Sequence, residues 1–106
     1  EVWNFKSALL DINTPVTIPT VYKLEQNYPN PFNPATKIKY SIKETSKVSL
    51  KIYDLYGRLV ETLVDEFKSP GDYVSSWHPI NKASGIYYYQ IKTGDFNSIR
   101  KMVFMK

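Results

Sequence analysis

Few side chains in this sequence have the chemistry for catalysis or metal binding. His78 is the only histidine and cysteine is absent, so a hydrolytic triad, a zinc site, a cysteine nucleophile and a disulfide framework all lack the residues they need. His78 stands between Trp77 and Pro79, which indicates a structural position at the end of a strand. No phosphate-binding or dinucleotide-binding glycine pattern occurs. We therefore expect a protein that is not an enzyme, has no catalytic residue and uses no cofactor.

The acidic side chains gather in or beside predicted turns. Carboxylates are common there because they accept hydrogen bonds from nearby backbone amides. The alternative, a weak calcium site, would lack the ligand spacing of an EF-hand. We expect turn chemistry and no metal at these residues: Asp54, Asp65, Glu66, Asp72 and Asp95.

Aromatic and basic residues suggest two kinds of ligand. Tyr87, Tyr88 and Tyr89 are consecutive, and with Ile91 pointing inward, strand alternation buries Tyr87 and Tyr89 and exposes Tyr88. Exposed aromatic rings can stack on sugars, so a carbohydrate-binding module is one alternative function, favoured if several rings formed a row.

The net charge is +4, and lysines follow the predicted strands at Lys37, Lys39, Lys47 and Lys51. A nucleic-acid site would need arginines and interleaved aromatic residues. We therefore interpret the lysines as a solvated sheet face and expect no nucleic-acid partner, with an anionic partner as the alternative.

The elements that would position these residues are strands. The 106 residues suit one domain, and Tyr, Ile, Val and Thr predominate among the residues that favour strands. Alternation of apolar and polar residues, interrupted by turn residues, predicts about six strands, which is typical of an antiparallel sandwich or barrel. The predicted strands cover residues 37–42, 47–52, 58–64, 73–77, 86–93 and 96–105.

The connections between these strands carry their own signals. We predict a hairpin loop at Lys43–Ser46, tight turns at Asp54–Gly57 and Gly94–Asp95, a loop over Asp65–Asp72 and an irregular segment over Pro79–Ser84. The predicted core combines the inward residues of these strands: Ile38, Tyr40, Ile42, Val48, Leu50, Ile52, Trp77, Tyr87, Tyr89 and Ile91.

The N-terminal part differs in composition. Residues 1–12 contain Trp3 and Phe5 and are either an extra strand or the end of a preceding domain, whereas Asn13–Thr20 reads as a proline-containing linker. Because the first residue is Glu1, we interpret the chain as a fragment or a processed product. No apolar run is long enough for a transmembrane segment. We divide the chain into residues 1–23, the end of a preceding region and its linker, and residues 24–106, one domain.

Four segments carry a resemblance to a known family. Leu24–Pro34 contains three prolines in its last six residues and is predicted to be an ordered, kinked loop. Its run Tyr28–Pro34 (YPNPFNP), the strand and turn VSLKIYDLYG at Val48–Gly57, the run SGIYYY at Ser84–Tyr89 and the tail KMVFMK at Lys101–Lys106 closely resemble, in this order, the C-terminal sorting domains of the type IX secretion system. That family is itself similar to the immunoglobulin-like domain of flagellar hook-capping proteins.

The resemblance implies an all-β fold, an immunoglobulin-like antiparallel β-sandwich of about six to seven strands. It also implies a function: a secretion-sorting signal that directs a larger cargo protein across the outer membrane of bacteria of the Bacteroidetes type, through the periplasm, to the cell surface or the medium. The implied partners are the outer-membrane secretion machinery and a surface sortase-like peptidase, which would cut upstream of Leu24, within the segment Asn13–Tyr22. The recognition residues carried over from the family are Pro29, Asn30, Pro31, Gly85, Tyr87, Lys101, Met102, Val103, Phe104, Met105 and Lys106.

The C-terminal strand could be recognised through its backbone hydrogen-bonding groups. If Phe96–Met105 lies at a sheet edge, its backbone groups are available for strand addition by a partner or by a second copy, giving a dimer. The alternatives are an ordinary core strand and, for the whole domain, an immunoglobulin-like spacer of an extracellular enzyme.

Overall fold

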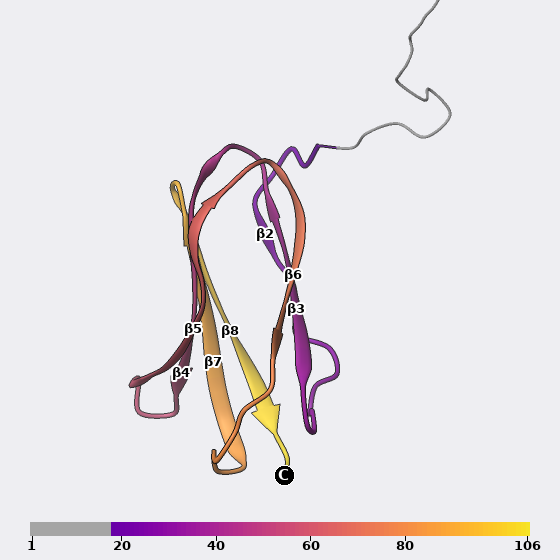
Figure 1. Ribbon diagram of the computed structural model, residues 1–106, viewed down its shortest axis with the longest axis vertical. Helices are drawn as coiled ribbons and strands as arrows, with labels where there is room; N and C mark the ends of the chain where they lie inside the picture. Colours follow the sequence, from indigo (N-terminus) through magenta and orange to yellow (C-terminus); the bar gives the residue numbers. More distant parts are fainter. Residues whose placement is uncertain (1–17) are drawn as a thin grey trace, which may run out of the picture.

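The protein is a two-layer β-sandwich whose strands run along the long axis of the molecule (Figure 1). The computed structural model describes residues 18–106. In this part the chain forms only strands, turns and loops. The strands are β2 (Lys23–Leu24), β3 (Thr36–Ile42), β4 (Ser46–Asp54), β5 (Leu59–Lys68), β6 (Gly71–Trp77), β7 (Gly85–Thr93) and β8 (Phe96–Phe104).

The strands form two antiparallel sheets. The smaller has the order β2-β3-β6 and the larger the order β5-β4-β7-β8. Two hairpins, β4–β5 and β7–β8, are closed by the predicted turns at Asp54–Gly57 and Gly94–Asp95. Gly57 and Gly94 have φ values of 83° and 55°, which glycine adopts without steric cost. The predicted all-β antiparallel sandwich is confirmed.

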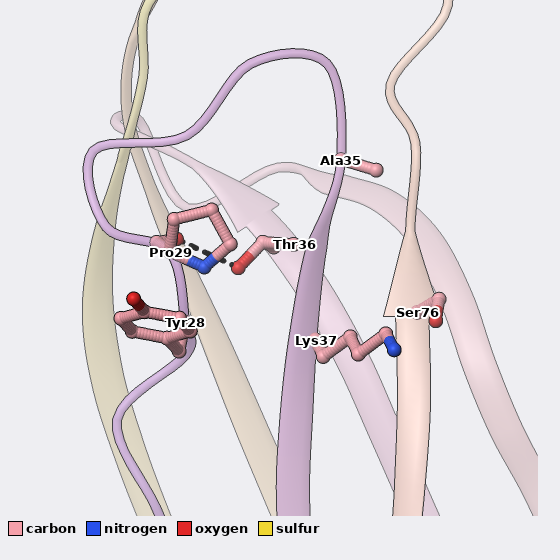
Figure 2. A pocket seen from close by; sticks show the side chains of 6 residues that line it. All are labelled: Tyr28, Pro29, Ala35, Thr36, Lys37 and Ser76. Carbon is pink, nitrogen blue, oxygen red and sulfur yellow. Dashed lines mark hydrogen bonds between the residues drawn. The ribbon is translucent and has the colours of Figure 1, made fainter.

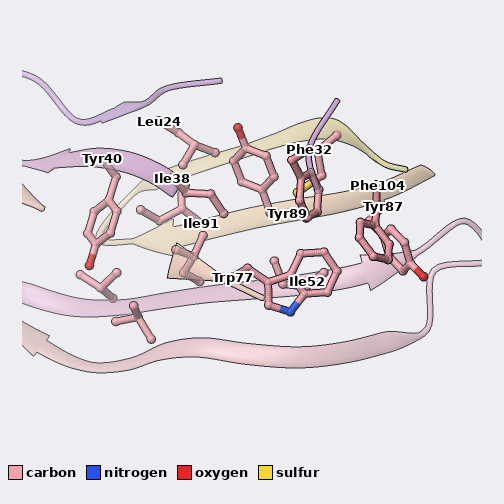
Figure 3. Close-up of a cluster of buried hydrophobic side chains, with 14 of the residues drawn as sticks. Leu24, Phe32, Ile38, Tyr40, Ile52, Trp77, Tyr87, Tyr89, Ile91 and Phe104 are labelled. Carbon is pink, nitrogen blue, oxygen red and sulfur yellow. The ribbon is translucent and has the colours of Figure 1, made fainter. Parts of the chain in front are cut away.

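The core lies between the sheets, and all ten predicted core residues are buried. Alternation places one side of each strand inward, as β3 illustrates: Ile38, Tyr40 and Ile42 are buried, whereas Lys37 and Lys39 are exposed. Figure 3 shows Trp77 and Ile52 beside Tyr89 and Tyr87 in this cluster. Five further residues join the core that were not predicted: Leu24, Phe32, Val64, Met102 and Phe104.

Two predicted loops were wrong. Lys43–Ser46 is not a hairpin loop, because β3 and β4 belong to different sheets and the segment crosses between them. Both strands bury alternate residues in one core, so the pattern cannot reveal which strands pair. The predicted loop Asp65–Asp72 is mostly strand: β5 continues to Lys68 and β6 starts at Gly71. Its polar end is held by backbone pairing with β4, which needs no apolar side chains.

The N-terminal predictions stay largely open. Residues 1–12 and most of the linker Asn13–Thr20 lie outside the described residues. The boundary between residues 23 and 24 falls within β2 and remains a prediction. Among residues 18–106, no helix has the length and apolar character to cross a membrane.

Candidate functional site

The site begins where the loop before β3 meets the C-terminal strand. We call residues 25–34 the proline loop. Its Phe32 N–H donates to Val103 O at 3.0 Å, and its Phe32 carbonyl accepts from Met105 N–H at 3.0 Å. The Asn30 side chain adds a third bond, with its Oδ1 accepting from Val103 N–H at 2.9 Å. Two motifs separated by about seventy residues are therefore joined by a short parallel bridge.

Apolar packing strengthens this junction. The Phe32 ring is only 2% exposed, and its centroid lies 5.2 Å from that of Phe104 and 5.8 Å from that of Trp77. Aromatic pairs at these separations add favourable ring contacts to the gain from removing apolar area from water. Phe32 thus anchors the proline loop in the core next to the end of β8 (Figure 3).

A buried polar network holds the start of the proline loop. The Tyr89 hydroxyl, on β7, donates to the Glu25 carbonyl at 2.6 Å and accepts from Asn27 N–H at 2.8 Å. Asn27 is 2% exposed, and its Nδ2 donates to Thr36 Oγ1 at 2.9 Å and to the Pro29 carbonyl at 3.1 Å. Burial is the main cause that raises the pKa of Tyr89 to about 12. These bonds connect the proline loop to the first residue of β3 and to β7.

The network also reaches the last strand. Gln26 Nε2 donates to the side-chain oxygen of Asn27 at 2.7 Å and to the Lys101 carbonyl at 2.7 Å. From β8, Arg100 Nε donates to the Leu24 carbonyl at 2.8 Å. The loop and the last strand are therefore one interlocked unit in which each stabilises the position of the other.

The tip of the proline loop is on the surface. Pro29, Asn30 and Pro31 are exposed, and Tyr28 is 81% exposed. Tyr28 and Pro29 line a hollow of about 310 Å³ with Ala35, Thr36, Lys37 and Ser76. Figure 2 shows the Thr36 hydroxyl bonded to the Pro29 carbonyl beneath this surface. The predicted recognition residues of this motif are thus accessible to a partner.

The residues of the SGIYYY motif have mainly structural surroundings. Tyr87 is 7% exposed, its hydroxyl donates to the Ala83 carbonyl at 2.7 Å, and its ring packs edge-on against Trp77 at 5.3 Å. Burial also raises the pKa of the Tyr87 phenol. A tyrosine at the start of a strand whose hydroxyl returns to the backbone a few residues earlier is the tyrosine corner of immunoglobulin-like sandwiches. Gly85, with φ of 150°, opens the strand.

The tail divides into two sets. Met102 and Phe104 are 0% and 4% exposed and belong to the core, whereas Lys101, Met105 and Lys106 are exposed and Val103 is half-buried. β8 lies at the edge of its sheet, as strand addition requires.

The expectation of an open tail edge is wrong near the C-terminus. The outward backbone groups of Val103 and Met105 are bonded to the proline loop, and Lys106 N–H donates to Ser84 Oγ at 2.8 Å. Antiparallel pairing alternates the direction of backbone groups, so the outward groups left without a backbone partner in residues 18–106 are those of Asn97, Ile99 and Lys101. The Lys101 carbonyl accepts from the Gln26 side chain instead. Strand addition at the tail itself would have to displace the proline loop.

The remaining candidate chemistry lies elsewhere. His78 is exposed directly after β6. Asp54 Oδ1 accepts from the backbone of Tyr56 and Arg58, and its Oδ2 accepts from Arg58 Nε at 2.7 Å. Together these bonds hold the pKa of the Asp54 carboxyl below its usual value, and the bond from the Arg58 backbone N–H is the largest cause. No cluster of metal-ligating side chains occurs in the described part of the chain.

These features define a class: a small antiparallel β-sandwich whose exposed proline-loop tip lies next to its C-terminal strand. A family model described as "Secretion system C-terminal sorting domain" matches residues 26–105, and the chain belongs to this family. It therefore carries a C-terminal sorting signal of type IX secretion, which implies interaction with the secretion machinery and export to the cell surface or the extracellular space. Searches of curated proteins and of solved structures found no significant match.

Sequence reasoning missed the residues that join the two motifs. Phe32 had no periodic pattern around it, and Gln26 and Asn27 were placed in a loop without partners. A usable signal was present: a single phenylalanine enclosed by prolines and asparagines is the one large apolar side chain of its run Pro29–Pro34, and such a residue is usually buried.

Proposed function

We propose that this domain is a non-catalytic sorting signal at the end of a larger cargo protein. The outer-membrane secretion machinery binds the domain, and a peptidase then removes it at the cell surface. The observation that carries the proposal is the family match over residues 26–105, which includes both the proline loop and the tail. Their interlocking through Phe32, Asn30 and Gln26 supports one composite recognition surface rather than two separate motifs.

The proposed route has two stages. The cargo crosses the periplasm with this domain already folded, and the folded surface is what the machinery binds before translocation. A sortase-like peptidase then cuts in the linker before β2, and the cargo is attached to the surface or released. Proteases bind extended segments, and Ile18 and Val21 in front of β2 are 58% and 61% exposed.

Tyr22 sets the end of the segment that a peptidase could reach. Its ring stacks on that of Phe96 with a centroid separation of 5.6 Å, and Lys43 Nζ lies 5.5 Å from its centroid. The chain from Tyr22 onward is therefore held against the domain. We place the scissile bond on the N-terminal side of this residue.

Two other assignments for the domain are weaker. We call the contacts that join the proline loop to β8 through Phe32, Asn30 and Gln26 the latch. An immunoglobulin-like spacer would not need such a latch. A dimer formed by edge pairing of β8 would have only the short stretch from Asn97 to Lys101 as a template, because the Lys101 carbonyl and the outward groups of Val103 and Met105 are bonded to the proline loop.

The test is a fusion of the complete 106-residue chain to the C-terminus of a fluorescent reporter that carries a signal peptide, in a host with a type IX pathway. We expect the reporter at the surface or in the medium with the chain attached, and in the periplasm without it. Equal distribution of both reporters would support the spacer instead.

Removing Lys101–Lys106 is an unsuitable variant, because it would delete the core residues Met102 and Phe104. Met105→Ser tests the exposed tail, and Ile80→Ser is its matched control, since these side chains are 57% and 68% exposed. We expect lower export for Met105→Ser and unchanged export for Ile80→Ser.

A further inference from the structure

The outer face of the four-stranded sheet carries a group of apolar side chains next to the tail. We call Tyr53, Leu55, Ile86, Tyr88, Ile99 and Val103 the tyrosine face. Pairing places Tyr53 opposite Tyr88 on β4 and β7, and Ile86 opposite Val103 on β7 and β8. The neighbours of these residues along each strand, such as Ile52, Tyr87 and Met102, point into the core. Because side chains alternate along a strand, the tyrosine face points away from the core and from the smaller sheet.

This face departs from the usual pattern of an exposed sheet surface. Outward positions of an antiparallel sheet are normally polar, as Lys37 and Lys39 on β3 are. The tyrosine face is instead apolar over three strands, with Leu55 and Ile99 55% and 57% exposed. Four of its side chains, those of Tyr53, Leu55, Tyr88 and Ile99, line a hollow of about 330 Å³ together with Asp54, Gly57 and Gln90. Exposed apolar groups gathered on one face mark a surface that another molecule covers.

The charge around the tyrosine face points to the nature of that molecule. Lys51, Lys92 and Lys101 occupy outward positions of the same sheet, and none of them takes part in an ion pair with any other residue in the range 18–106. Among residues 18–106, Asp54 is the carboxylate that lines the hollow, and its oxygens accept hydrogen bonds from Tyr56 and Arg58 in its own turn. The rim is therefore positive, which disfavours a second copy and favours a partner with an acidic rim.

The tail can contribute to this face only through side chains. Its outward backbone groups at Val103 and Met105 are bonded to the proline loop, and the Lys101 carbonyl accepts from Gln26. Val103 and Lys101 nevertheless point outward, beside Ile86 and Tyr88. A partner that reads these two tail residues would meet the tyrosine face at the same time.

We propose that the tyrosine face is the docking surface for a protein of the export machinery whose contact area is apolar with an acidic rim. This inference rests on the proposed sorting function and specifies which surface of the domain is read. The partner contacts the side chains of the tail and of three neighbouring strands, and leaves the latch between the proline loop and β8 closed.

A sugar is the other ligand that paired tyrosines suggest. The surroundings favour a protein, because aliphatic side chains offer no hydrogen bonds to sugar hydroxyls. The amide and the carboxylate that line the hollow are already used: Gln90 Nε2 donates to Asn97 Oδ1 at 2.8 Å, and Asp54 is occupied as described. Carbohydrate binding is therefore an outcome to be tested rather than the proposal.

The experiment uses two matched pairs of variants in the reporter fusion of the complete chain. Ile99→Glu places a carboxylate on the tyrosine face, and Val74→Glu places one on the outer face of β6, where the side chain is similarly exposed, at 55% against 57%. Lys101→Glu reverses the rim charge, and Lys39→Glu reverses a lysine on the smaller sheet. Thermal unfolding of each purified chain first establishes that the variants fold.

We expect Ile99→Glu and Lys101→Glu to reduce export at least about tenfold. An unpaired carboxylate in a desolvated apolar contact weakens binding by that factor or more, and so does a carboxylate placed opposite the acidic rim of the partner. Val74→Glu and Lys39→Glu should export like the unchanged chain. A photo-crosslinker at position 99, but not at position 74, should link the fusion to an outer-membrane component of the machinery.

The outcomes are distinguishable. If the unchanged chain is not exported, the sorting function itself fails. If it is exported and both tyrosine-face variants are exported equally well, the docking surface is wrong while the sorting function stands. Should Ile99→Glu fail to fold, Lys101→Glu alone decides. Binding of the chain to a glycan array that is lost in Tyr88→Ala, together with normal export of Lys101→Glu, would replace the protein partner by a sugar.

Discussion

The hydroxyl of Tyr89 ties the proline loop to the sandwich, and its removal has a calculable effect. Tyr89→Phe keeps the buried ring, which is 0% exposed, and deletes one oxygen that serves both Asn27 N–H and the Glu25 carbonyl. Leaving a buried polar group without a partner costs about 1–3 kcal/mol. A domain of this size has a free energy of unfolding of about 5–10 kcal/mol, so the variant should fold but be clearly less stable at pH 7.

The pH dependence gives the prediction a second, independent part. In the folded chain the Tyr89 phenol has a pKa of about 12, whereas in the unfolded chain the pKa of this phenol is about 10. Between these values the folded state binds one proton more, so the free energy of unfolding falls as pH rises, by about 1.4 kcal/mol per pH unit and about 2.7 kcal/mol in total. Tyr40 and Tyr87, whose pKa values burial also raises, act in the same direction.

Phenylalanine removes the contribution of Tyr89 to this slope. The difference between the two proteins, about 1–3 kcal/mol at pH 7, should therefore shrink as pH rises from 10 towards 12. Urea unfolding of both chains at pH 7, 9, 10 and 11 measures it, and faster hydrogen exchange at the Asn27 amide locates the loss. A variant within about 0.5 kcal/mol of the parent at pH 7, or two curves that stay parallel above pH 10, would refute this account of the network.

Three further predictions concern the tyrosine corner and the junction between the proline loop and β8. Tyr87→Phe should lower the free energy of unfolding by about 1 kcal/mol, because it removes the hydrogen bond of the tyrosine corner. Tyr88→Phe, on the half-exposed outer side, should change it little. Urea unfolding measures both variants, and equal free energies would show that the corner hydrogen bond does not stabilise the fold. Phe32→Ala should cost about 3–5 kcal/mol, seen as a large drop in melting temperature, and a small drop would mean that the ring is not a core residue. Asn30→Ala should speed hydrogen exchange at the amide of residue 103 while Asn33→Ala leaves it unchanged, and slow exchange in both would show that the latch does not need this side chain.

Much of the sandwich could be predicted from alternation alone. Ile38, Tyr40 and Ile42 alternate with polar residues, and strands of this kind have one inward face whichever strand they pair with. The same generality explains the error at Lys43–Ser46, since alternation does not report on sheet membership. The end of β5 was missed because an edge strand can be polar on both sides, as at Asp65 and Glu66.

The candidate site was predictable only in part. The resemblance brought the proline loop and the tail to attention, but their contact depends on a bridge between Phe32 and Phe104 that no local pattern encodes. Burial then separates residues that the motifs had grouped together: Tyr87 and Met102 stabilise the fold, whereas Lys101 and Val103 face outward. Only the three-dimensional arrangement distinguishes a residue that stabilises the fold of the domain from one whose side chain is available to a partner.

The central claim is that this folded domain is itself the export signal. The most direct measurement follows a reporter fused to the complete chain in two isogenic hosts, one with an intact type IX translocation pore and one without it, by protease accessibility at the surface and by fractionation. We expect a surface-exposed or released reporter in the first host and a periplasmic, protease-protected reporter in the second. Export that is equal in both hosts, or periplasmic retention in both, would contradict it.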